Sequence, residues 1–393
     1  MTSSCHRLSP AKSLLLAAAL LCGLSSVTNS FADPAGRDTR PQTAANVIVT
    51  PMFGGQIVGY DVDATGSEGV LSEVVNLSNG NVLAATETFY QPSGQILSVV
   101  AKTETQDDFV TQGVLGKVGL VLYQHNGQNF FLTMSPVESN KFTGSWTPPI
   151  KPNYQLGGIS ANQGSPAVAA YQFSSVTGLS YVFRSNIAEN TFGPQISLQD
   201  FITGNEFLQP RIALDNKAHR AILADSPGCS VLGCEMAILV VDLVYGDIAE
   251  YSDVIGLGAV NGLAVDPETS IACTTTSLDQ GVEFYDLVSG AGFEVKIPNA
   301  GSTTQAGLDV EFDSIHKLFL IAQYSSTGNI TDLEPRIYVY DEAGNLQETI
   351  TGLSRIPMSP ARIALNPKAR VGFVPVVVEF SNQEPLQLQS FHY

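Results

Sequence analysis

The chain has 393 residues, of which 44% are hydrophobic and only 14% are charged, and its formal net charge at pH 7 is −18. A surface this acidic repels phosphate backbones, which excludes nucleic acid as a natural partner. Glycine, serine, threonine, asparagine and glutamine are plentiful, a balance typical of exported β-proteins with many turns.

The first 32 residues have the pattern of an export signal. His6, Arg7 and Lys12 form a basic start, residues 14–24 are apolar, and the chain then reaches Ser-Phe-Ala, ending at Ala32. An apolar run of about eleven residues is too short to span a bilayer. We therefore expect cleavage near Ala32, a secreted or periplasmic protein, and no stable membrane insertion.

A lipoprotein signal is the alternative for this segment. It would use Cys22, but Leu21 is too large for the position before the modified cysteine. Removing residues 1–32 takes away two basic residues and no acid, which leaves 17 basic against 37 acidic residues and a net charge of −20. We expect residues 33–45 to be a flexible leader and residues 46–393 to form one domain.

Short apolar segments separated by polar turns fill the chain from residue 54 onward. Residues 54–66, GGQIVGYDVDATG, predict a strand and its turn. Residues 72–88 predict a hairpin that turns at Asn79-Gly80, and residues 118–134 predict another that turns at His125-Asn126-Gly127. Residues 157–198 continue with two further hairpins.

From residue 211 the hairpins become a repeat. A strand, a polar turn of about four residues and a second strand recur at 211–225, 261–275, 306–322 and 361–376. A second hairpin, in which a strand ends on Asp before a Gly-containing turn, follows at 237–251, 281–295 and 336–350. Four strands per unit, repeated about every fifty residues, are typical of propeller blades.

These units predict an all-β fold, a β-propeller with seven blades. Six blades are the alternative, if residues 90–115 are an insertion. Because the unit at 361–393 is short and residues 54–66 resemble an outer blade strand, we expect strands from both termini to close the ring, which hides sheet edges. The expected inner strands begin near residues 72, 117, 157, 210, 261, 306 and 361.

Three cysteines follow the export signal. Cys229 and Cys234 flank a short loop, and export permits a disulfide between them, although tight loops often strain such a bond. We predict this bridge. Cys273 lies in an apolar strand, where a small buried filler is the favoured interpretation over a nucleophile.

The units resemble bacterial propeller repeats of the YVTN/NHL-like group over most of residues 46–393. The resemblance lies in the pattern of strands rather than in a diagnostic motif. Trp146 is the only tryptophan, so the WD-repeat signature and tryptophan-docking repeats are missing. The sequence also has no haem-attachment motif, no Gly-x-Ser-x-Gly elbow and no phosphate-binding loop.

One hairpin is similar to the metal-binding hairpin of gluconolactonase/regucalcin propellers. In that family Asn-Gly opens an inner strand and Asp-Ser closes the next one. Asn261-Gly262 matches the first half, but Thr276 replaces the aspartate. The preceding unit has Asp225-Ser226 but carries Arg211 in place of the asparagine. The resemblance implies a divalent metal between Asn261 and Asp225; a strand-entry turn is the interpretation we favour for Asn261.

Arg211 and Arg362 begin inner strands in the same frame, RIAL in both cases. At one mouth of a central channel, two guanidinium groups have the chemistry to bind a carboxylate or a phosphate. The favoured alternative pairs each arginine with nearby acids, such as Asp225, Glu235 or Asp309.

Asp61 and Asp63 begin a second candidate site. With Thr65 and then Gly66 they place oxygen donors at alternate positions, as at the start of a calcium loop. The match is partial, because the twelfth position holds a serine and Glu73 comes one residue late. A solvated hairpin turn is the favoured alternative. His219 and His316 both fall in polar turns, a position that does not predict a zinc site.

We therefore expect a secreted, non-enzymatic binding or scaffold module that takes a protein or small-molecule ligand. The expected contact loops are residues 225–235, 277–280 and 323–335. The alternative function is a divalent-metal-dependent lactonase or related hydrolase at the channel mouth. No cofactor is firmly implied beyond the candidate Ca²⁺, and a monomer is expected.

Overall fold

The computed structural model describes residues 47–393 except residues 65, 106–108, 116–117, 126–127, 136–140, 147–153, 162–166, 175, 178, 187–190, 200–210, 226–233, 257–258, 277–280, 298–305, 327–332, 357–361 and 378–385. The described elements are all β-strands. In that part of the chain no helix is long and apolar enough to cross a membrane. Residues 41–393 form one compact unit, and the predictions for residues 1–32 and 33–45 lie outside the described residues.

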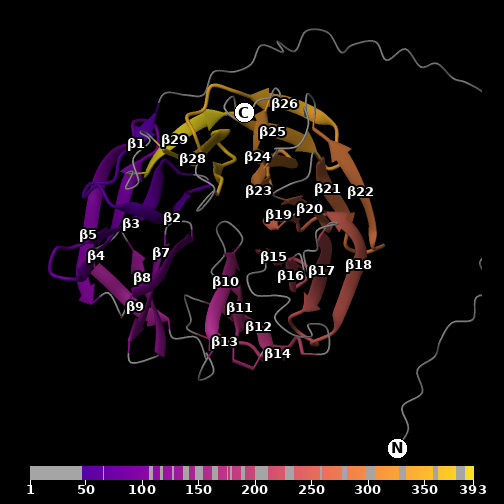
Figure 1. Cartoon of the computed structure of the whole chain (residues 1–393), viewed down its shortest axis with the longest axis horizontal. Helices are drawn as coiled ribbons and strands as arrows, with labels where there is room; N and C mark the ends of the chain where they lie inside the picture. Colours follow the sequence, from indigo (N-terminus) through magenta and orange to yellow (C-terminus); the bar gives the residue numbers. More distant parts are fainter. Residues whose placement is uncertain are drawn as a thin grey trace, which may run out of the picture. The chain divides into compact units, whose positions relative to one another are not determined.

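The described strands are hydrogen-bonded into seven sheets, which lie around a common centre (Figure 1). In each of the three sheets nearest the N-terminus the strands follow one another in chain order. Their strands are β2 (Gln56–Val62), β3 (Glu68–Asn76), β4 (Asn81–Tyr90) and β5 (Gln95–Thr105); β6 (Phe109–Leu115), β7 (Val118–His125), β8 (Gln128–Ser135) and β9 (Lys141–Trp146); and β10 (Gln155–Ala161), β11 (Ala167–Phe173) and β12 (Ser180–Asn186), with β13 (Thr191–Phe192) and β14 (Ile196–Ser197) both paired to β12.

The next three sheets repeat the same antiparallel order. Their strands are β15 (Arg211–Asp215), β16 (Arg220–Asp225), β17 (Cys234–Asp242) and β18 (Ile248–Gly256); β19 (Val260–Asp266), β20 (Ile271–Thr276), β21 (Gly281–Asp286) and β22 (Ala291–Lys296); and β23 (Ala306–Asp313), β24 (Leu318–Ser326), β25 (Leu333–Asp341) and β26 (Leu346–Ile350).

The last sheet combines both ends of the described chain. Its strands are β27 (Ala364–Asn366), β28 (Val371–Val377), β29 (Leu386–His392) and β1 (Ile48–Val49), and β1 lies beside β29. Ile48 pairs with Gln389 and Val49 pairs with Leu388. The first and last described strands are therefore neighbours in one sheet.

At most of the junctions between sheets, the first strand of one sheet packs against the first strand of the next. These inner contacts join β10 to β15, β15 to β19, β19 to β23, β23 to β27, β27 to β2, and β2 to β6. Inner strands predicted near residues 157, 210, 261, 306 and 361 are confirmed as β10, β15, β19, β23 and β27.

The two remaining inner-strand predictions are wrong. The inner strands begin at Gln56 and Phe109 rather than near residues 72 and 117. Residues 54–66 do not supply an outer strand, because β2 packs between β27 and β6. The strand that completes the last sheet is the two-residue β1 instead. Residues 95–105 and 109–115, within the segment that the six-blade alternative treats as an insertion, form β5 and β6.

In four of the sheets, a buried acidic or amide side chain at the end of the inner strand organises the hairpin turn that follows it. Asp215, Asp266, Asp313 and Asn366 occupy this position and are all buried. Each side-chain oxygen accepts a hydrogen bond from a backbone N–H two or three residues later, at 2.8–3.1 Å. The fourth residue after each of them has a positive φ, in the order His219, Ser270, Lys317 and Arg370. Lys317, and not His316, is thus the counterpart of His219.

Apolar side chains fill the contacts between neighbouring sheets. Among the described residues, five buried clusters each bridge two consecutive sheets. One example joins Ile222 and Val240 to Ala272 and Tyr285. Burial of this surface between sheets is the main force that holds them together.

The cysteine predictions are only partly covered by the described residues. Cys273 is a free, buried cysteine in the sheet of β19–β22, and burial raises the pKa of its thiol. Cys229 and the side chain of Cys234 lie outside the described residues. The bridge between them stays a prediction.

Candidate functional site

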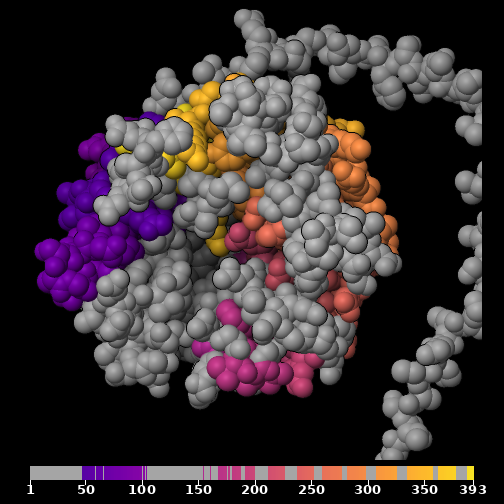
Figure 2. Space-filling model, viewed as in Figure 1, coloured from indigo at the N-terminus to yellow at the C-terminus, as the bar shows by residue number. Residues whose placement is uncertain are grey.

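Charged side chains gather where the inner strands meet. Arg211 opens β15, Asp309 lies in β23, and Arg362 stands just before β27. Asp309, Arg362 and Asp225 all act electrostatically on the Arg211 guanidinium. The structure therefore brings together three of the four residues predicted at the channel mouth. In the space-filling view, the surface is hollowed near the centre about which the sheets lie (Figure 2).

Asp309 interacts electrostatically with both arginines. Its Oδ2 accepts a hydrogen bond from the backbone N–H of Ile363 at 2.7 Å, which ties β23 to the segment before β27. Burial raises the pKa of Asp309 to about 6, although Arg362, the Ile363 N–H and Arg211 all act to lower it. Both arginines act electrostatically on Asp309, and the alternative favoured from the sequence, in which each arginine pairs with nearby acids, stays a prediction.

Glu311 and Tyr60 belong to this site although no sequence motif marks them. Burial, followed by the charges of Asp309 and Asp61, raises the pKa of Glu311 to about 8. Acids at positions 309 and 311 share one face of a strand because side chains alternate. That alternation was the signal in the sequence, but only the placement of β2 beside β27 adds Asp61 to the group.

Tyr60 fixes the segment that carries Arg362. The Tyr60 hydroxyl donates to the Arg362 carbonyl oxygen and accepts from the Arg362 N–H at 3.1 Å. Tyr60 is buried, and burial followed by the charge of Asp309 raises its pKa well above the ordinary value. The Arg362 side chain itself is exposed, so its guanidinium is available to solutes.

The Arg211 guanidinium is less accessible. Its Nε is buried and has no hydrogen-bond partner among the described residues. Burial lowers the pKa of Arg211, while Asp309 and Asp225 act in the opposite direction. A buried donor without a partner is costly, so an added acceptor at this position is favourable.

Asn261 links two neighbouring inner strands by a hydrogen bond. Its Nδ2 donates to the backbone oxygen of Gly307 at 2.6 Å, which joins β19 to β23. At Gly262 a Cβ atom would lie 2.5 Å from the backbone nitrogen of Val310. The Asn-Gly pair therefore allows two backbones to approach closely. The strand-entry turn favoured for Asn261 from the sequence stays a prediction.

Asp61 and Asp63, the predicted calcium ligands, lie at the end of the first inner strand. Asp61 is a residue of β2 and its Oδ1 accepts from the Val62 N–H at 2.8 Å, whereas Asp63 follows the strand. Within the described part of the chain, no group of three or more histidine, cysteine, aspartate or glutamate residues is arranged to hold a metal ion. The calcium site stays a prediction.

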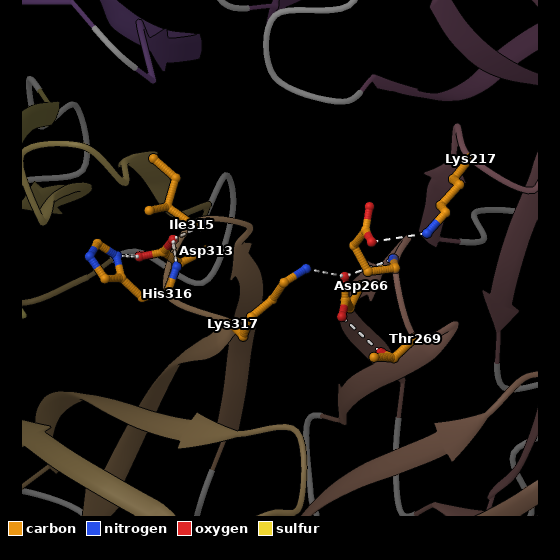
Figure 3. A network of polar contacts seen from close by, with 8 residues as sticks. Lys217, Asp266, Thr269, Asp313, Ile315, His316 and Lys317 are labelled. Carbon is orange, nitrogen blue, oxygen red and sulfur yellow. Dashed lines mark hydrogen bonds and ion pairs between the residues drawn. The ribbon is translucent and has the colours of Figure 1, made fainter.

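The hairpin turns carry a separate polar network that links neighbouring sheets (Figure 3). Lys317 Nζ contacts Asp266 Oδ1 at 3.2 Å, and Lys217 Nζ contacts Glu268 Oε2 at 2.9 Å. His316 Nδ1 lies 2.8 Å from Asp313 Oδ2 within its own turn. This network joins three consecutive sheets and has a structural role.

The predicted contact loops are mostly outside the described residues. The expected loops are residues 225–235, 277–280 and 323–335. Of these, residues 226–233, 277–280 and 327–332 are not described. Glu235, a proposed partner of the arginines, is described in its backbone only.

Comparisons with known proteins define the class. No protein-family model and no curated protein matches the chain. A chain of the mitotic checkpoint complex aligns with a TM-score of 0.56 and 15% identity, covering 92% of this chain and 95% of that one. U3-55K aligns with a TM-score of 0.55 and 12% identity, over 88% and 99%. The protein is thus an all-β chain with the β-propeller fold.

The WD40 repeats of RRP9 are another structural neighbour, with a TM-score of 0.55, 12% identity, and coverage of 90% of this chain and 99% of that one. Identities this low show the fold alone. The comparisons do not support the expected resemblance to YVTN/NHL-like or gluconolactonase/regucalcin propellers.

Proposed function

We propose that this protein is an exported, non-enzymatic binding or scaffold module. It takes a protein or small-molecule ligand, and its ligand contacts include an anionic group at the mouth where the inner strands begin. The observation that carries this proposal is the arginine pair: Arg362 is exposed, and the buried Nε of Arg211 lacks an acceptor among the described residues.

The charges around the arginines favour a site that binds particular anions over one that binds any anion. Asp309 partly compensates both guanidinium groups, so a bound anion must compete with it. Guanidinium groups bind carboxylates and phosphates through two parallel hydrogen bonds. This geometry favours the binding of a planar carboxylate in a defined orientation. A binding role is favoured over a metal-dependent hydrolase because Thr276 stands where the metal-binding hairpin would need an aspartate.

Calorimetry on the full chain tests this proposal, with succinate, citrate and inorganic phosphate as probes. We expect at least one probe to bind, and Arg362→Gln to weaken its Kd by about tenfold, the effect of roughly 1.4 kcal/mol. Arg370→Gln is the matched control, because Arg370 lies in the hairpin turn after β27. Absence of binding by every probe, or equal losses in both variants, would overturn the anionic site.

We also propose that each of the seven sheets is one blade and that the blades close into a ring. The support is that every sheet contains a four-strand antiparallel path, and that the pairing of β1 with β29 joins the two ends. A six-blade ring would leave one of these sheets outside it. Cryo-electron microscopy or crystallography of the exported chain tests the number directly, and a ring of six would reject it.

A further inference from the structure

Two buried glutamates face each other in the sheet of β2–β5. Glu73 on β3 and Glu87 on β4 are both 0% exposed. Glu73 pairs with Ala85 and Leu71 pairs with Glu87, so the two glutamates are diagonal neighbours on one face of the sheet. Among the described side chains no cation acts on Glu87, and burial of two carboxyl groups without such a partner requires a specific arrangement.

The pair holds the segment that connects β1 to β2. The Met52 N–H donates to Glu87 Oε1 at 2.8 Å. The N–H groups of Phe53 and Gly55 donate to Glu73 Oε1 and Oε2, at 2.8 and 2.6 Å. Three backbone hydrogen bonds therefore connect the segment after β1, the strand that pairs with β29, to the two glutamates.

Of the four carboxyl oxygens of the pair, Glu87 Oε2 is the one that shows where a proton must lie. Glu87 Oε2 is buried and meets no donor among the described residues. The side chain within hydrogen-bonding reach is Glu73, which is itself an acceptor. Two carboxylates in contact cannot both be ionised in a buried site, so they share a proton. In agreement, burial and then Glu73 raise the pKa of Glu87 to about 8.

The surroundings of the pair are apolar. The buried cluster on this side of the sheet contains Val49 of β1, Ile57 of β2, Leu71 of β3 and Leu388 of β29. Among the described side chains, Glu73 is the charged group that acts on Glu87. The other acids of β2 and β3 are Asp61 and Glu68, toward the opposite end of their hairpin, where β2 turns into β3.

We propose that Glu73 and Glu87 form a proton-operated latch on the closing strand β1. With one proton shared, the pair binds residues 52–55 and so keeps β1 on β29. When that proton leaves, repulsion between the two buried carboxylates releases the segment. Because β1 supplies only Ile48 and Val49 to the sheet, its place depends strongly on this anchor.

Release has a structural consequence at the other end of the chain. The edge of β29 loses its partner, and an unpaired strand edge is a template for pairing with another chain. Val49, which is fully buried, leaves the core at the same time. The latch thus makes exposure of this edge dependent on pH.

Hydrogen exchange of the full chain, read by mass spectrometry between pH 6 and 9.5, tests the latch. After correction for intrinsic exchange, we expect protection of residues 47–57 in the wild-type protein to fall by about tenfold per pH unit from pH 6 to about pH 8, and to level off above that pH, where the pair has lost its proton in the closed state as well. The strands β19–β22 report whether the rest of the fold is intact.

Two isosteric variants separate a latch from ordinary packing. Glu87→Gln supplies a permanent donor to Glu73 and still accepts from Met52, so protection should stay high at every pH. In Glu73→Gln, the side-chain NH2 group takes the place of one carboxyl oxygen and cannot accept the hydrogen bond from the N–H of Phe53 or Gly55. Protection should therefore be low at every pH. Flat protection in the wild-type protein, or the same pH dependence in Glu87→Gln, would overturn the proposal.

Discussion

At the scale of single residues, the electrostatics of the site around Arg211 and Arg362 depend on buried acids whose ionisation is unfavourable. Asp309 and Glu311 share one face of β23, and each carboxylate adds to the negative potential at the other. The arginines were predictable, because Arg211 and Arg362 stand in the same RIAL frame. Glu311 was not, since its environment depends on Asp61, which is 250 residues away in the chain and reaches it only through the neighbouring sheets.

Replacement of Glu311 by Gln tests this environment. The pKa of Glu311 is about 8 in the folded protein and ordinary in the unfolded chain, so the wild-type protein loses stability as the pH rises from 6 to about 8, whereas the amide variant does not. At pH 9 the wild-type carboxylate is ionised, and Glu311→Gln should raise the Tm by about 2–4 °C, roughly 1 kcal/mol. The exposed Glu250→Gln is the control and should show no such pH dependence. Equal Tm differences at pH 6 and pH 9 would contradict the account.

Gly262 tests the close approach of β19 and β23. A Cβ atom there would lie 2.5 Å from the Val310 nitrogen and 2.8 Å from the Asp309 Cα. Urea unfolding should show that Gly262→Ala destabilises the fold by about 2–3 kcal/mol, as overpacking does. Gly80→Ala is the control: it meets open space and adds only the strain of a positive φ, about 1 kcal/mol. A smaller loss at Gly262 than at Gly80 would be inconsistent with this contact.

At the scale of elements, the later hairpins were predictable and the earliest strands were not. From residue 211 onward, a strand, a capping Asp or Asn and a short turn recur at regular spacing, so strand ends follow from local chemistry. The strand β2 contains one glycine and one aspartate and does not match this repeat, and its inner place is set by contacts with β27 and β6.

The turn after β19 gives a test at this scale. Ser270 has a φ of 59°, which glycine adopts without strain. Ser270→Gly should therefore stabilise the protein by about 0.5–1 kcal/mol, the difference between the left-handed penalty and the entropy of glycine. In contrast, Thr269→Gly removes the hydrogen bond to Asp266 and should cost about 1 kcal/mol. Losses of similar size in both variants would contradict the assigned turn.

At the scale of the whole molecule, raised carboxyl pKa values determine how stability varies with pH. The pKa values of Glu87 and Glu311 are about 8, that of Glu342 is about 7 and that of Asp309 is about 6, with burial as the first cause in each case. These groups hold more protons in the folded than in the unfolded state. Their stabilising contribution is fully present below the ordinary carboxyl range and is lost as the pH rises to about 8.

Thermal unfolding should therefore show a Tm that rises as the pH is lowered from 8 to 5. The net charge of −18 acts in the same direction, because acidification reduces repulsion. Below this window the trend should reverse, since hydrogen bonds from Ser289 and Val288 lower the pKa of Asp286. A Tm that falls steadily from pH 8 to pH 5 would show that these carboxyl groups are not buried as described.

The central claim of the account is that the first and last described strands lie side by side in one sheet. A disulfide between Ile48→Cys and Gln389→Cys measures this directly, because these residues are paired across β1 and β29. We expect oxidation to link the two terminal peptides, as detected by mass spectrometry after proteolysis. The offset pair Ile48→Cys and His392→Cys should link poorly, because His392 is paired with Val371. Equal linkage in both pairs, or no linkage between residues 48 and 389, would contradict the arrangement.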